Sequence, residues 1–301
     1  MNELQYMEFS LFGHPFKFRW PRQGTALNPL DISDVITAEN AEAYVLAKCA
    51  QVSHGVAEFG TQYGLYSVVM AKALPPGGKL VGLEILPFNA QISNENLKTN
   101  GLSEKGIVLH AAASDADGYD TVMIDVHREN ASLLGAEGPI HGIGTMDVPR
   151  FSFARLRSYF GPFDMIKMDV EGYEGHLIQT MDLPMAGVNI AAIEIHPHSM
   201  HSLFGKTTAE FMGHFDPDQY CGFMLVGSNG CFTVHDLGDE SALNNSVTVN
   251  AFFFRKGVHD DLASVLRQSM ETMGQSRADG SFTPAAATVP DQVHQSELSH
   301  A

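Results

Sequence analysis

Two short stretches, IKMDVEGYEGHLI at residues 166–178 and EIH at residues 194–196, carry side chains whose types and spacing could do chemistry. Each completes an apolar, strand-like run: Asp169 ends the first, and Glu194 and His196 end the second. Ligands of open α/β sheets bind beyond the carboxyl ends of the strands, so these side chains are expected to face one cleft. A carboxylate or an imidazole there can accept a proton from a substrate. Asp169 and His196 are therefore candidate general bases, although a histidine at this place could also satisfy local backbone groups.

Lys167 lies in the middle of the first run, where burial without a partner would cost on the order of several kcal/mol. It is expected to pair with Glu194 on the adjacent strand, as structural support. Glu171 is a candidate for orienting the substrate. Glu174, within the following helix, could be a solvated acid or could favour the helix N-terminus electrostatically. The candidate catalytic residues are thus Asp169, Glu171, Glu194 and His196.

A glycine turn forms the second candidate site, in the stretch VAEFGTQYGLYS at residues 56–67. The stretch predicts a strand, a tight turn and the start of a helix. Gly60 can take a positive φ, which lets backbone approach a ligand closely. Alone, the pattern is also typical of a plain strand-to-helix turn. Glu84 ends the next predicted strand, where an acid can bind both hydroxyls of a ribose, so the pair favours nucleoside binding.

The spacing of the turn narrows the choice of nucleoside. A dinucleotide site requires G-x-G-x-x-G and a Walker loop requires Gly-Lys-Ser/Thr, whereas the chain has GTQYG at residues 60–64. Glu58, just before the turn, would repel phosphate but favour an ammonium or a sulfonium. The cationic amino-acid nucleoside S-adenosylmethionine (SAM) fits best, and the missing middle glycine disfavours an NAD-dependent dehydrogenase.

Six segments come in the order and spacing of one known family: VAEFGTQYGLYS, LVGLEILPFN, LKTNGL, AAASDADG, IKMDVEGYEGHLI and AAIEIH. Through them the chain resembles the FkbM-family methyltransferases over residues 40–257. The resemblance implies a class I, Rossmann-like enzyme that uses SAM. Many members methylate hydroxyl groups, so it further implies an O-methyltransferase that acts on a small molecule or a sugar-containing acceptor.

The resemblance also implies roles for individual positions. It places the methionine and ribose end of SAM along the turn, at Glu58, Phe59, Gly60, Thr61, Gly64 and Ser67. Glu84 would hold the ribose diol, and Ser114 and Asp115 would lie near the adenine. The family turn usually reads Asp-x-Gly-Ala-Asn-x-Gly, and EFGTQYG at residues 58–64 departs from it while keeping an acidic first position.

A divalent metal is the second chemistry that these stretches allow. His196, His198 and His201 lie in EIHPHSMH, and together with Asp169 and Glu171 they could bind a cation that acidifies an acceptor hydroxyl. The intervening proline and the loop character make the histidine spacing a weak indication. A metal is therefore not favoured, and no metal ligands are predicted.

Helix-like and strand-like segments alternate over residues 41–257, which predicts a Rossmann-like, doubly wound α/β domain with a mostly parallel sheet. Two late segments, at residues 221–237 and 246–256, predict an antiparallel C-terminal hairpin and edge strand. Residues 1–40 form an N-terminal extension whose aromatic stretch FSLFGHPFKFRW predicts a hairpin, either a substrate lid or core packing. Residues 258–301 predict a short helix and a disordered polar tail.

Composition limits the partners and the compartment. The formal net charge is −17, with 18 basic and 35 acidic residues, which disfavours a nucleic-acid substrate. The 3 cysteines show no CxxC spacing, which is typical of a reducing compartment. No signal peptide and no apolar run of about 20 residues is apparent, so a cytoplasmic protein without a membrane span is expected. A non-catalytic binding or partner subunit remains the alternative from another functional class, and the oligomeric state is left open.

Overall fold

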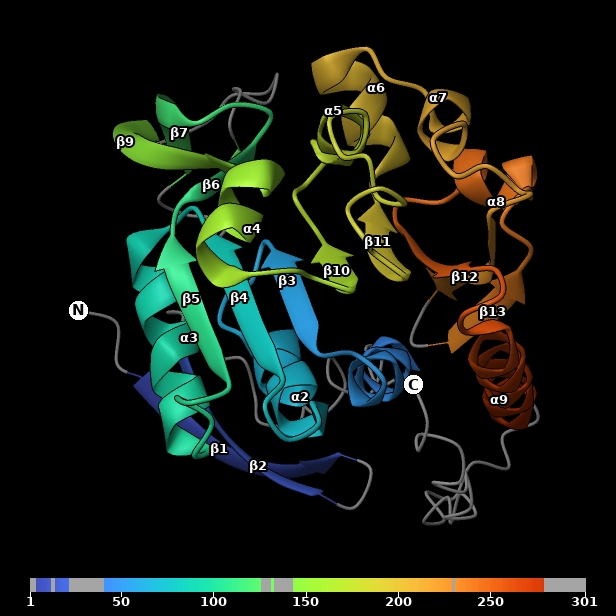
Figure 1. The fold of residues 1–301 in the computed structure, drawn as a ribbon, viewed down its shortest axis with the longest axis horizontal. Coiled ribbons are helices and arrows are strands. Elements are labelled where there is room, and N and C mark those ends of the chain that lie inside the picture. Colours follow the sequence, from blue (N-terminus) through green and yellow to red (C-terminus); the bar gives the residue numbers. More distant parts are fainter. Residues whose placement is uncertain are drawn as a thin grey trace.

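The computed structural model describes residues 4–11, 14–21, 41–125, 131–132, 143–228 and 231–278. An eight-stranded sheet of order β13-β12-β14-β11-β10-β3-β4-β5 forms its centre (Figure 1). The strands are β3 (Gly55–Phe59), β4 (Lys79–Glu84), β5 (Gly106–His110), β10 (Met165–Met168), β11 (Ile190–Ile195), β12 (Tyr220–Ser228), β13 (Cys231–His235) and β14 (Val249–Arg255). The five strands β5, β4, β3, β10 and β11 run parallel, whereas β14, β12 and β13 each pair with their neighbours in antiparallel orientation. This arrangement confirms the predicted fold class.

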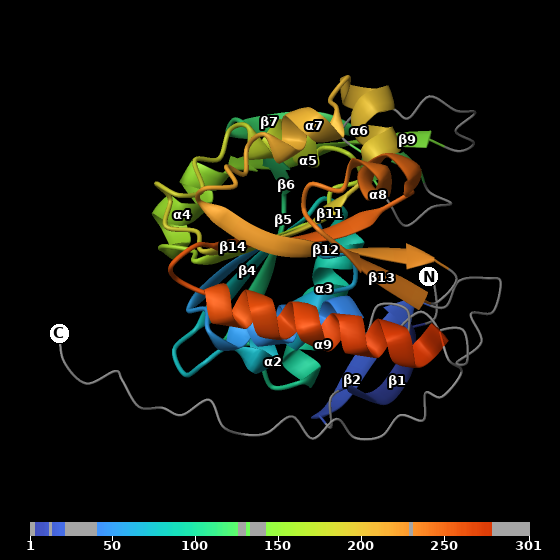
Figure 2. The ribbon, with the colours of Figure 1, turned by 90° about the vertical axis from the view of Figure 1, so that its right-hand side faces the viewer.

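Helices cover both faces of the sheet (Figure 2). One face carries a helix over residues 41–51, together with α2 (Leu65–Ala73), α3 (Pro87–Thr99) and α9 (Asp260–Ala278). The other carries α4 (Phe153–Phe160), α5 (Glu174–Ile178), α6 (Pro197–Phe204), α7 (Thr208–Met212) and α8 (Glu240–Asn245). Because β3 and β10 are buried on both faces, their sequences read as nearly continuous apolar runs.

Alternating residues of β10 belong to these two layers. Ile166 and Met168 pack into the core under α4 to α8, whereas Met165 packs into the core under the helix over residues 41–51. Lys167 has the same parity as Met165, so it faces that helix as well. This parity decides which partners a buried lysine can find.

The third predicted strand, GIVLHAAAS, divides in two. Its first part is β5, but its second part, β6 (Ala112–Ser114), pairs in parallel with β9 (Ile143–Ser152) in a separate four-stranded sheet. The break falls at Ala111, whose N–H donates to the last residue of β4, Glu84. Beyond it β4 offers no further pairing partner. The small sheet also contains β7 (Gly118–Asp125) and β8 (Ala131–Ser132).

The N-terminal hairpin forms as expected, from β1 (Leu4–Leu11) and β2 (His14–Pro21). It packs on α3: the Arg19 N–H donates to the Asn96 side chain, whose amide returns a hydrogen bond to the Arg19 carbonyl. Phe16 and Phe18 are buried in a core shared with α2 and α3. These aromatic side chains are core packing, and residues 22–40, the rest of the predicted extension, lie outside the described part.

The C-terminal strands differ from expectation in one respect. The last strand, β14, lies inside the sheet between β11 and β12, and β13 forms the edge. The run Phe252–Phe254 is buried on both faces, which is typical of an interior strand. Helix α9 extends to Ala278, and the remainder of the predicted tail, residues 279–301, lies outside the described part. None of the helices described has the length and hydropathy needed to span a membrane.

Candidate active site

The carboxyl ends of β3, β10 and β11 meet at one edge of the sheet and bring the two candidate sites together (Figure 1). Gly60 follows β3 with a φ of 79°, and a β-carbon there would overlap the carbonyl oxygen of Asp169. Glycine is therefore needed because the turn touches the residue after β10, a reason that the sequence pattern did not reveal. Asp169, Glu171, Glu194 and His196 come from neighbouring strand ends, as predicted.

Lys167 forms ion pairs with partners other than the one predicted. Its Nζ lies 3.1 Å from Asp169 Oδ2 and 3.9 Å from Glu42 Oε1, and the side chain is 1% exposed. The predicted pairing with Glu194 is wrong: the lysine faces the helix over residues 41–51, which supplies Glu42, and its charge meets Asp169 two residues along the same strand. Burial alone would lower the pKa of Lys167, but Asp169 and Glu42 raise it above its ordinary value. The site thus holds a permanent positive charge.

Asp169 shows the reciprocal effect. Burial acts to raise its pKa, but the charges of Lys167 and then His196 hold that pKa below its usual value. Lys167 and His196 also act to lower the pKa of Glu194, but burial followed by the charges of Asp169 and Glu42 outweighs them and raises that pKa well above normal. Of these two candidate carboxyl groups, Asp169 is therefore the one kept ionised.

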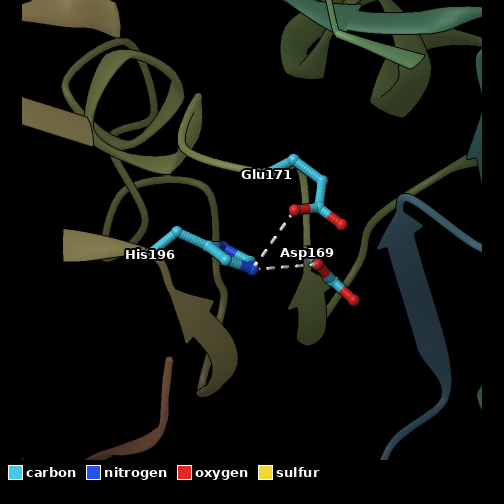
Figure 3. Close-up of side chains that lie close together, drawn as sticks. All are labelled: Asp169, Glu171 and His196. Atoms are coloured by element: carbon cyan, nitrogen blue, oxygen red, sulfur yellow. Dashed lines mark ion pairs between the residues drawn. The ribbon is translucent and has the colours of Figure 1, made fainter. Parts of the chain in front are cut away.

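His196 is the centre of the cluster (Figure 3). Its Nε2 lies 3.6 Å from Glu171 Oε2, 3.9 Å from Glu194 Oε1 and 4.0 Å from Asp169 Oδ1. Burial would lower the pKa of the imidazole, but the hydrogen bond and charge of Glu174 raise that pKa to about 9. A protonated imidazole is a poor proton acceptor, which counts against the predicted general-base role of His196 in the ligand-free protein.

Glu174, for which the sequence leaves open a solvated acid or a charge that favours the helix N-terminus, is a further functional candidate. Its side chain is fully buried, and Oε1 accepts hydrogen bonds from the N–H groups of Val170 and Gly172 and lies 2.9 Å from His196 Nδ1. The sequence signal for the burial of Glu174 is the pair of glycines that flank it, Gly172 and Gly175. A β-carbon at Gly172 would overlap Ser199 of α6, so this position must be small for α6 to pack over Glu174, and one at Gly175 would displace the end of the Met200 side chain.

A cavity of about 260 Å³ joins the glycine turn to this cluster. Its lining comprises Glu42, Gly60, Thr61, Gln62, Tyr63, Leu65, Tyr66, Asp169, Glu194, Thr248 and Asn250. Glu42 and Tyr66 were not predicted, and the Tyr66 hydroxyl donates to Glu42 at 2.7 Å. A signal for Glu42 existed, since it precedes buried Val45 and Leu46 by three and four residues and so shares their helix face.

Two of the three acids predicted for the cofactor, Glu58 and Glu84, are buried. Glu58 is fully buried and accepts a hydrogen bond from Ser67 through Oε2, while Oε1 has no partner among the described residues. Glu84 accepts from the N–H groups of Gln62 at 2.8 Å and Leu86 at 2.9 Å. Burial is the main cause that raises the pKa of each glutamate to about 7. Neither acid has a cation in hydrogen-bond contact among the described residues.

The other predicted cofactor positions are distributed around the turn. Phe59 packs in the core against Phe153, and Gly64 begins α2 with a φ of 80°. Ser114 donates to Asp115 at 3.0 Å, and Asp115 Oδ2 lies 3.3 Å from His176 Nε2. Neither Ser114 nor Asp115 lines the cavity, so their adenine role stays a prediction.

Backbone strain marks the same edge of the sheet. Among the described residues, two that are not glycine have a positive φ, Gln62 at 48° and Glu171 at 55°. One lies in the turn that lines the cavity, and the other in the cluster around His196. Such conformations cost about 1–3 kcal/mol and concentrate at functional sites.

Part of the cluster also has the composition of a metal site. Asp169, Glu171 and His196 each offer an atom within 4.8 Å of the others. The other two histidines of the sequence-based alternative, His198 and His201, lie in α6 and do not belong to this group.

Comparisons with known proteins identify the family of the chain. The family model described as the methyltransferase FkbM domain matches residues 54–224. The catechol O-methyltransferase of Mycobacterium tuberculosis is 28% identical over 120 residues, which are 36% of this chain and 54% of that protein. The match thus spans about half the length of this curated relative.

Two solved structures illustrate the structural likeness. The O-methyltransferase TomG of Streptomyces achromogenes in complex with SAM has a TM-score of 0.40 and 12% identity, covering 78% of this chain and 93% of that one. The O-methyltransferase of Bacillus cereus in complex with SAH has a TM-score of 0.38 and 13% identity, covering 77% and 84%. Since the family model covers more than half of the sequence, the chain belongs to the family of methyltransferases with an FkbM domain.

Proposed function

We propose that the protein is a SAM-dependent methyltransferase that methylates a hydroxyl group of a small molecule or a sugar-containing acceptor. One observation carries this proposal: a single cavity joins the glycine turn after β3 to Asp169 and Glu194 after β10 and in β11. A methyl donor held by the turn and an acceptor held by the carboxylates would therefore meet in one space. Family membership supports the same activity.

The cofactor half of the pocket suits a cation. The buried Oε1 of Glu58 has no partner among the described residues, and an unpaired buried carboxylate is costly. The ammonium or sulfonium of SAM would supply the missing charge. Glu84 retains acceptor capacity beyond its two backbone hydrogen bonds, since an ionised carboxylate offers about four lone-pair sites, so it can also accept from a ribose diol.

The acceptor half holds the hydroxyl and receives its proton. SAM supplies a methyl group on sulfur that passes to the acceptor oxygen by in-line displacement, and most of the rate gain comes from positioning. Asp169, kept ionised by Lys167, accepts the hydrogen bond of the hydroxyl and then its proton. Glu171 and Glu194 orient the acceptor around it. His196, which Glu174 orients, contributes a positive charge that offsets the charges of these carboxylates.

An acceptor screen tests the reaction type. The purified protein is incubated with SAM and matched pairs of acceptors that differ only in a hydroxyl or an amine, and SAH formation is measured. SAH formation with hydroxyl acceptors only is the expected result. Formation with the amine partners alone would overturn O-methylation. SAM binding without turnover by any acceptor in the panel would instead favour a non-catalytic binding subunit.

A further inference from the structure

We propose that Asp169, Glu171 and His196 form a binding site for one divalent cation of the manganese, iron or zinc type. The site itself stands on the geometry below. Its purpose, to bind and acidify the acceptor hydroxyl, rests on the proposed function and gives the cation the activation that Asp169 provides when no cation is bound. A metal is not favoured from the sequence because a proline and the loop character make the spacing of His196, His198 and His201 a weak indication. The fold brings only His196 to the carboxylates.

The ligand atoms are nearly in place (Figure 3). His196 Nε2 lies 3.6 Å from Glu171 Oε2 and 4.0 Å from Asp169 Oδ1. Neighbouring ligands of a cation bound at about 2.1 Å are about 3 Å apart. A cation between the three atoms would therefore require shifts of about an ångström or less, within reach of side-chain rotation.

A buried carboxylate orients the ring of His196, as is typical of histidines that bind metals. Glu174 is fully buried, is fixed by two backbone N–H groups and lies 2.9 Å from His196 Nδ1. A carboxylate on the far nitrogen sets the ring orientation and directs the other nitrogen at the ion. His196 is 8% exposed, and the carboxylate nearest to its Nε2 is that of Glu171 at 3.6 Å, beyond hydrogen-bond distance. Nε2 thus faces the carboxylates of Glu171, Glu194 and Asp169 without a hydrogen bond to any of them.

Charge balance points the same way. Four carboxylates approach His196 within 4.0 Å, those of Asp169, Glu171, Glu174 and Glu194. Lys167 at Asp169 and the imidazolium of His196 are the positive charges among these groups. A dication that takes the place of the imidazolium proton adds one positive charge to a half-buried group of carboxylates, whose burial is costly unless cations compensate for them.

The ligand types indicate the class of ion. Imidazole nitrogen favours iron, zinc and similar cations, and carboxylate oxygen favours manganese and magnesium, so a mixed set suits Mn²⁺, Fe²⁺ or Zn²⁺ better than Ca²⁺. Three protein ligands leave coordination positions open. Because Asp169 and Glu194 line the cavity, an open position can face it and receive a hydroxyl whose pKa the metal lowers.

Manganese titration tests the site without SAM or an acceptor. The EDTA-treated full-length protein is titrated with Mn²⁺, and the electron paramagnetic resonance signal of free Mn²⁺ is followed. One ion per chain with a micromolar Kd is expected. Glu171→Gln and Asp169→Asn should each weaken binding at least tenfold, and Glu174→Gln about 10- to 100-fold through the loss of histidine orientation.

The matched control is Glu104→Gln, because Glu104 is an exposed acid at the opposite, amino-terminal end of β5. It should leave the affinity unchanged. Glu171 has a side chain that is 45% exposed, so Glu171→Gln can be compared at equal thermal stability. No Mn²⁺ uptake by the wild type, or uptake that Glu171→Gln leaves intact, overturns the proposal. Since no methyl donor is present, failure here is distinct from failure of the methyltransferase activity, which SAM binding and the acceptor screen report.

Discussion

The two halves of the pocket handle buried acids in opposite ways. On the cofactor side, Glu58 and Glu84 are held by a serine and by backbone N–H groups, and burial raises the pKa of each to about 7. On the acceptor side, Asp169 lies against Lys167, which lowers its pKa. The first half has no cation in hydrogen-bond contact with its acids among the described residues, whereas the second contains the side chains of Lys167 and His196. On the proposed function, this difference suits a cationic methyl donor at the turn and a neutral acceptor at the cluster.

Removing the ionised carboxylate of the acceptor side should have the largest effect. Asp169→Asn is expected to lower turnover about 10²- to 10⁴-fold, because the acceptor proton loses its acceptor. SAM affinity should change less than threefold in a calorimetric titration, since the cofactor side keeps both acids. A matching loss of SAM affinity would show that Asp169 contacts the cofactor, and the two halves of the pocket would then not be separate.

Removing the internal cation should cost stability. Lys167→Met leaves Asp169 and Glu42 without their shared partner, and breaking a buried ion pair from one side costs about 3–5 kcal/mol. Chemical denaturation measures this loss, with Lys98→Met on the exposed face of α3 as the control. A loss no larger than the control's would show that the acceptor side does not depend on its own cation.

The pH dependence of stability should distinguish the cofactor side. The pKa of Glu58 is about 7 in the folded protein, against an ordinary value of 4.5. The folded state therefore holds this proton more tightly than the unfolded chain does, so its contribution to stability is full below about pH 4.5 and is lost as the pH rises through 7. In Glu58→Gln this loss is absent.

Without SAM, Glu58→Gln should therefore exceed the wild type in stability by about 2–3 kcal/mol at pH 8 and by much less at pH 5. Denaturation of both proteins at the two pH values checks this difference. An equal gap at the two values would mean that Glu58 is not the titrating group. In SAM the order should reverse at pH 8, because only the wild type gains a charge partner.

The smallest expected effect concerns the ribose. Glu84→Ala should weaken SAM binding by about 1–3 kcal/mol through the loss of charged hydrogen bonds. Glu104→Ala serves as the control, and circular dichroism shows whether the variant remains folded. A dissociation constant that stays at the wild-type value would remove Glu84 from the ribose.

Sequence could predict what depends on local pattern. The order of strands and helices and the convergence of Asp169, Glu194 and His196 follow from apolar runs and from where parallel strands end. The second partner of Lys167, Glu42, could not be predicted in this way, because it lies on a helix about 125 residues earlier, and side-chain parity without the helix layer pointed to Glu194. Contacts between layers are set by packing that no local pattern encodes.

Glu174 shows a second limit. An acid at the start of a short helix has the pattern of a solvated residue. Only the fold over it, in which α6 lies against Gly172 and Gly175, buries the carboxylate and brings it to His196. The two glycines indicated a close contact at this position, but the sequence does not show that α6 makes it.

Calorimetric titration with SAM, with NAD as the comparison ligand, tests the central claim that the pocket takes a cationic nucleoside at the glycine turn and an acceptor at Asp169. We expect micromolar SAM binding, about −8 kcal/mol, that Asp169→Asn retains and Glu84→Ala weakens, with no measurable affinity for NAD. A folded protein that binds NAD but not SAM, or that binds neither, would contradict it.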